Sequence, residues 1–65
     1  MDTNSRVKEL IDERHISLRK LALLSNVPYS TLKSSAARHS QLTIETIEMI
    51  CKGLNISMAD FFAVA

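Results

Sequence analysis

Residues 28–41, PYSTLKSSAARHSQ, are rich in hydrogen-bond donors and poor in large apolar side chains. At helical spacing, Leu32 and Ala36 share one face, and the opposite face carries Tyr29, Ser30, Lys33, Ser34 and Ala37. Hydroxyl and ammonium groups on one face can donate hydrogen bonds at short range, but no general base stands beside them to make a nucleophile. We therefore expect this segment to bind a partner and expect no enzyme activity.

The charges are unevenly distributed, although the net charge is only +1. All seven acidic residues lie outside residues 14–44, whereas that segment holds Arg14, His15, Arg19, Lys20, Lys33, Arg38 and His39. This asymmetry favours a polyanionic partner, although an ordinary solvated surface would give the same pattern. The two histidines are too isolated for a metal site, which needs three or four ligands, so we expect neither a metal nor another cofactor.

The chain has 65 residues, of which 46% are hydrophobic and 23% charged, as in a single folded domain. Its one cysteine, Cys51, excludes an internal disulfide and fits a reducing compartment. The N-terminus is polar and the apolar runs are short, so neither a signal peptide nor a membrane-spanning helix is predicted. We expect a cytoplasmic protein that does not bind membranes.

Apolar residues recur at helical spacing, and no segment alternates as a strand would. Five helices are predicted, at 4–14, 17–25, 28–37, 43–54 and 57–63. Three of them should begin at a hydroxyl that caps the first turn, namely Ser17, Thr43 and Ser57, and the third should begin at or just after Pro28. Asn26 and Asn55 follow two of the apolar stripes, where a left-handed residue often ends a helix.

The short connection between the second and third predicted helices suits a helix-turn-helix at about 17–37. Residues 6–62 resemble the Cro/cI-like (XRE-type) helix-turn-helix family of DNA-binding regulators, through RVKELIDER, ISLRKLALLSNVPYSTL and LTIETIEMICKGLNISMADFF. The resemblance implies that residues 1–65 form one all-α, five-helix domain like those of phage repressors. It also implies that the third helix enters the major groove of double-stranded operator DNA, in a homodimer that represses transcription.

The resemblance also implies which residues contact DNA. The family's base-reading positions fall on Tyr29, Ser30, Lys33 and Ser34. Backbone contacts fall on Ser17, Arg19, Thr31, Arg38, His39 and Ser40, with Arg14 and Lys20 as weaker candidates. A lysine can donate to guanine, and a serine can bond several bases, so the operator sequence stays undetermined.

Four positions depart from the family pattern. Leu18 stands where a glutamine often binds phosphate, and Ser35 stands where a large apolar residue usually anchors the third helix. The Asn-Gly pair that commonly ends that helix is replaced by Ala37 and Arg38. Without the glycine, the helix is expected to continue by about a turn, which would let Arg38 reach a phosphate.

The C-terminal segment MADFFAVA has more apolar surface than a short helix can bury in its own domain. Phe61 is expected in the core, whereas Met58, Phe62 and Val64 are expected to form a self-complementary dimer surface, unless they simply close the core. An alternative function is a protein-interaction module, such as an adaptor or the antitoxin of a toxin–antitoxin pair. Whether residues 1–65 are a domain of a longer regulator also stays open.

Overall fold

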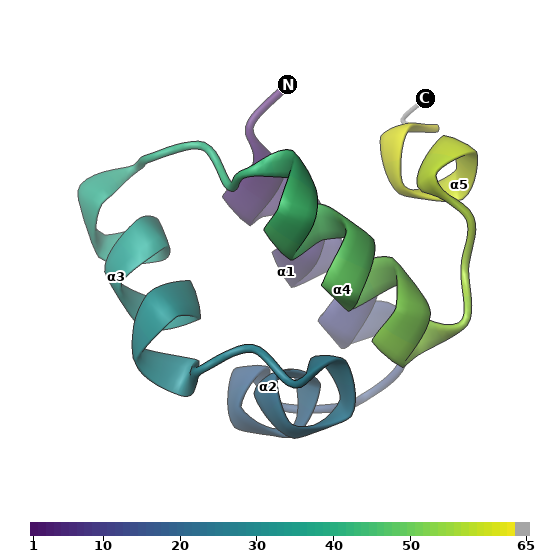
Figure 1. Ribbon diagram of the computed structural model, residues 1–65, viewed down its shortest axis with the longest axis horizontal. Helices are drawn as coiled ribbons and strands as arrows, with labels where there is room; N and C mark the ends of the chain where they lie inside the picture. Colours follow the sequence, from purple (N-terminus) through teal and green to yellow (C-terminus); the bar gives the residue numbers. More distant parts are fainter. Residues whose placement is uncertain (64–65) are drawn as a thin grey trace.

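The computed structural model describes residues 1–63, which form five α-helices and no strand (Figure 1). The helices are α1 (Thr3–Glu13), α2 (Leu18–Ser25), α3 (Tyr29–Arg38), α4 (Ile44–Leu54) and α5 (Met58–Phe62). The predicted all-α architecture is confirmed, and every expected helix boundary agrees to within one residue. No helix in this range has the length and apolar character needed to cross a membrane.

The helix starts follow from short polar side chains. Ser17, Thr43 and Ser57 are N-caps, as predicted, and each hydroxyl accepts the amide three residues on, at 3.0, 3.2 and 2.9 Å respectively. The Ser57 amide in turn donates to the Asp60 carboxylate, which completes a capping box. Asp2 caps α1, which the sequence had not led us to expect. These bonds satisfy amides that have no partner inside their own helix.

Left-handed residues close the first four helices, although none of these residues is glycine. Asn26 and Asn55 have φ values of 56° and 57°, as predicted, and His15 and His39 adopt the same conformation at 56° and 55°. In each case the next backbone amide bonds to the carbonyl five residues earlier, which is the Schellman closure.

The expected continuation of α3 is therefore wrong. His39 supplies the left-handed conformation that a glycine would otherwise provide, so α3 ends at Arg38.

Helix α4 lies at the centre of the molecule, with α1 behind it and with α3 and α5 on opposite sides (Figure 1). Leu21, Ile47, Ile50 and Phe61 are fully buried in the core, so the expected burial of Phe61 is confirmed. Helix α2 packs very closely on α4 at Gly53, where a Cβ atom would lie 2.7 Å from the Cα atom of Ser25. This contact explains the only glycine of the chain.

A polar network holds the C-terminal end of α3 where the family pattern has an apolar anchor. The Asn4 side-chain amide on α1 donates to the carbonyl oxygens of Ser40 at 2.7 Å and Ser35 at 3.2 Å. The Ser35 hydroxyl also donates to the Ser40 carbonyl, at 2.8 Å. Ser35 thus anchors the end of α3 by hydrogen bonds rather than by apolar packing.

Candidate nucleic-acid interface

The exposed face of α3 is polar and carries no acidic group. Leu32, which is 2% exposed, is the only buried residue of this helix. Ser30, Lys33 and Ser34 are exposed, and Tyr29 is half-buried at the first helical position. The expected burial of Leu32 is confirmed, whereas Ala36, expected on the same apolar face, is exposed. The exposed polar groups of this face are the short hydroxyls of Ser30 and Ser34 and the ammonium group of Lys33, which can bond to a surface that lies close against the helix.

One flank of this face contacts α2 through a cation–π interaction. The guanidinium carbon of Arg19 lies 4.3 Å from the centroid of the Tyr29 ring. The ammonium nitrogen of Lys33 lies 6.0 Å from the same centroid, near the outer limit of such an interaction. The structure therefore brings a predicted phosphate ligand, Arg19, together with two predicted base-reading residues.

The other flank borders a shallow groove of about 380 Å³ between α3 and the start of α4. Four predicted DNA-contacting residues of α3 line it, namely Ser30, Thr31, Ser34 and Arg38, and Ser40 lies beyond them. Thr43 and Thr46 line the opposite wall. The sequence marked Thr43 only as a helix cap, and Thr46 carried no signal, because their approach to α3 depends on the path of the connection between the helices.

Ser17 is fixed at the start of α2 rather than free to turn toward a ligand. Its hydroxyl oxygen accepts the Lys20 amide at 3.0 Å. Helix α2 can attract an anion through the positive end of its dipole and through the guanidinium of Arg19, the second residue of the helix.

Among the described residues, no acidic side chain neutralises the cations of α2 and α3. Both salt bridges within residues 1–63 lie on α1, where Arg6 pairs with Glu9 at 3.8 Å and Lys8 pairs with Asp12 at 3.3 Å. Arg14 donates to the Leu54 carbonyl at the end of α4, at 3.4 Å. In the same range, the side chains of Arg19, Lys20, Lys33 and Arg38 form neither a salt bridge nor a hydrogen bond, so their charge remains available to a polyanion.

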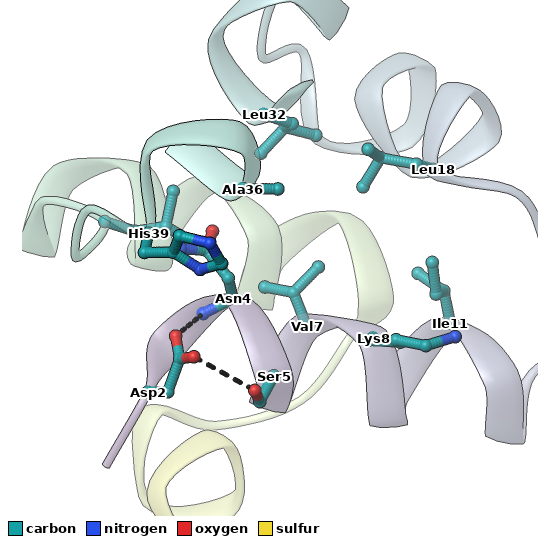
Figure 2. A pocket seen from close by; sticks show the side chains of 11 residues that line it. Asp2, Asn4, Ser5, Val7, Lys8, Ile11, Leu18, Leu32, Ala36 and His39 are labelled. Carbon is teal, nitrogen blue, oxygen red and sulfur yellow. Dashed lines mark hydrogen bonds between the residues drawn. The ribbon is translucent and has the colours of Figure 1, made fainter. Parts of the chain in front are cut away.

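His39 lies apart from the exposed face of α3. Its side chain lies beside Asn4 and Asp2 at the start of α1 (Figure 2). Hydrogen bonds from the Ser5 hydroxyl and the Asn4 amide lower the pKa of Asp2, and the charge of His39 adds a smaller effect in the same direction. A DNA contact by His39 stays a prediction.

Leu18 packs inward and does not replace the missing phosphate ligand. It contacts the core and lines a groove of about 400 Å³ between α1 and the helix-turn-helix, together with Val7, Ile11 and Leu32 (Figure 2). Within residues 1–63, no three His, Cys, Asp or Glu side chains gather as a metal site would require.

The predicted dimer residues lie in and just beyond α5. Phe62 is 41% exposed, whereas Met58 packs half-buried against the core, with its sulfur 3.6 Å from that of Cys51. Val64 lies outside the described residues. Arg6 fixes the end of α5, because its side chain donates to the carbonyl oxygens of Phe61 at 2.5 Å and Asp60 at 2.8 Å.

Comparison with known families supports the resemblance seen in the sequence. The family described as the Cro/C1-type HTH DNA-binding domain matches this chain over residues 6–64, which is nearly its whole length. No curated protein and no solved structure matches the chain.

Proposed function

We propose that this chain, which belongs to the Cro/C1-type helix-turn-helix DNA-binding family, represses transcription by binding a two-fold symmetric operator as a homodimer. Helix α3 enters the major groove and reads base edges with Ser30, Lys33 and Ser34, and with Tyr29 at its start. The observation that carries this proposal is the exposed face of α3, which has short polar side chains, no acid, and a lysine that forms no salt bridge within residues 1–63.

Phosphate contacts flank α3 on both sides. Arg19 and the start of α2 contact the phosphates of one DNA strand. Arg38 and Thr31 contact those of the other strand from the groove beside α4. Ser40 extends this second flank, and Thr43 and Thr46 join it. His39, whose side chain lies beside α1, is kept as a predicted backbone contact outside this flank. A recognition helix bordered by cations on both sides suits a groove whose two walls are phosphate backbones.

The dimer forms through the α5 end, with Phe62 at its centre and Met58 beside it. Val64, which lies outside the described residues, is proposed as a further member of this surface. The molecule measures 26 × 22 × 22 Å, and α3 and α5 lie on opposite sides of α4 (Figure 1). Two copies joined through α5 therefore carry their α3 helices far apart. This arrangement is compatible with half-sites separated by one DNA turn, about 34 Å.

Selection of bound duplexes from a random DNA pool tests the proposal. The expected result is enrichment of a pseudo-palindrome whose half-sites are centred about 10 base pairs apart, with affinity that falls steeply as salt rises. If the folded protein enriches no sequence and shifts no duplex at low salt, the proposal is wrong.

A second candidate function is a protein-interaction module, as in an antitoxin or adaptor. It is favoured by exposed apolar side chains outside α3, chiefly Leu23, which is 75% exposed and lines a groove with Arg19 and Tyr29, and Phe62 on α5. A stoichiometric protein partner that co-purifies with the chain, together with no selective DNA binding by the chain alone, would support this function over the first.

A further inference from the structure

The Tyr29 ring lies at the junction of the two elements that approach DNA. Tyr29 is the first residue of α3, directly after Pro28, and its ring contacts the guanidinium of Arg19 on α2. It also lies within reach of the Lys33 ammonium group, one turn further along α3. The ring is half-buried and packs against the core, so its position is fixed by the fold.

We propose that Tyr29 is a positioning residue that holds Arg19 for a phosphate contact and so couples that contact to base reading by Lys33. This inference rests on the proposed DNA-binding function and adds a task to the base-reading role assigned to Tyr29. Long basic side chains lose conformational freedom when they bind. Because the ring already restricts Arg19 in the free protein, less of that freedom remains to be lost on DNA.

The arrangement of charge supports this role. Within residues 1–63, Arg19 forms no salt bridge, so the aromatic face is the contact that orients its guanidinium. A carboxylate partner would also orient it, but would cancel the charge that a phosphate needs. An aromatic ring orients the cation and leaves its charge available.

The second flank offers a matched comparison. Arg38 is an exposed cation in the groove beside α4, and it has no aromatic partner within residues 1–63. Arg19 and Arg38 thus share the same charge and the same proposed phosphate role, but only Arg19 is stacked.

A double-mutant cycle on a selected operator duplex tests whether Tyr29 is coupled to Arg19 but not to Arg38. Tyr29→Leu and Arg19→Gln should each weaken binding about tenfold, but together they should weaken it much less than the hundredfold expected of independent changes. Tyr29→Leu and Arg38→Gln should combine additively. Tyr29→Phe keeps the ring and should therefore keep the coupling to Arg19. The base preference of this variant protein should change only if the Tyr29 hydroxyl reads a base.

Proton NMR of the free protein supplies a readout that needs no DNA. The Arg19 side-chain protons should be shifted upfield by the ring current in the wild type and in Tyr29→Phe, and should return to ordinary values in Tyr29→Leu. Circular dichroism checks that each variant is folded. If Tyr29→Leu does not fold, the ring-current shift of the Arg19 protons in the wild type and in Tyr29→Phe still decides whether the ring holds Arg19.

Three results overturn the inference in different ways. Additive effects of Tyr29 and Arg19 show that the ring does not couple them, even though DNA is bound. Unshifted Arg19 protons in the wild type show that the stack is not formed. If the wild-type protein binds no duplex at all, the proposed function is wrong and the inference fails with it.

Discussion

Lys33 and Arg38 lie on the same helix but serve different purposes in the proposed complex. Lys33 is on the exposed face of α3, where a base edge is close enough for a hydrogen bond. Arg38 is on the flank that borders the groove beside α4. A base contact depends on DNA sequence, whereas a phosphate contact does not.

We expect Lys33→Ala and Arg38→Ala to separate these two roles. Lys33→Ala should cost about 1–3 kcal/mol at the cognate site and relax the preference at one base pair. Arg38→Ala should weaken all sequences alike and reduce the slope of log affinity against log salt by about one. Fluorescence anisotropy on the selected duplex and on single-base variants measures both effects, and equal loss on every duplex for Lys33→Ala would contradict the assignment.

Cys51 shows how burial changes the chemistry of a residue. It is 3% exposed on the inner face of α4, and burial raises the pKa of its thiol, with smaller contributions from the charges of Asp60 and Glu48. The reactive form of cysteine is the thiolate. The native thiol is therefore expected to be inert near neutral pH.

We expect Cys51 to react with a thiol reagent only as the protein unfolds. Because the pKa is raised in the folded state, the free energy of unfolding should fall as pH rises past the unfolded thiol value, about 8.5. Cys51→Ala should lack this part of the pH dependence. Labelling rates and urea unfolding between pH 7 and about 10 measure the two effects, and fast labelling of the native protein at pH 7 would show that the thiol is not protected.

At the scale of the elements, the sequence predicted helix starts better than contacts between helices. A cap is local, because Ser17 or Thr43 needs only an amide three residues away. The left-handed ends at Asn26 and Asn55 were also predicted from the sequence, whereas those at His15 and His39 were missed, although histidine too is enriched in that conformation. The hydrogen bonds from the Asn4 side chain to the Ser35 and Ser40 carbonyl oxygens join residues distant in sequence, so no local pattern reveals them.

The close packing of α2 on α4 depends on the absence of a side chain at Gly53. We expect Gly53→Ala to destabilise the protein by about 1–3 kcal/mol, because its Cβ atom would collide with the backbone of Leu24 and Ser25 at the end of α2. Lys52→Ala, at an exposed position of the same helix, is the control and should change stability little. Thermal or urea unfolding measures the difference, and a Gly53→Ala variant as stable as the wild type would show that α2 can move away at no cost.

At the scale of the whole molecule, Arg6 connects the first helix to the last. Its buried side chain bonds the carbonyl oxygens of Asp60 and Phe61, next to the exposed ring of Phe62. The proposed dimer surface is therefore held by α1 as well as by the core contact of Phe61. The sequence indicated that the α5 segment has more apolar side chains than a short helix can bury in its own domain. It did not indicate which of them the fold leaves exposed, since that depends on how α5 packs on α4.

We expect Phe62→Glu to weaken the dimer without unfolding the domain. The charge would be buried between two copies, whereas the ring is 41% exposed in a single copy. Sedimentation should show a monomer at concentrations where the wild type is a dimer, and affinity for a full operator should fall more than affinity for a half-site. Leu23→Glu, on α2, is the control for added charge in the sedimentation measurement and should leave the dimer intact. Its operator affinity is not a control, because Leu23 lines a groove with Arg19 and Tyr29.

The single apolar seam of α3 has an evolutionary consequence. Folding requires Leu32 to stay apolar, but it places little demand on Ser30, Lys33 or Ser34, because these side chains are exposed. In the proposed complex, mutations at such positions would change the preferred operator without first lowering stability. Under that proposal, descendants of this protein would acquire new DNA targets by single substitutions, while the selection that maintains the fold acts on a different set of residues.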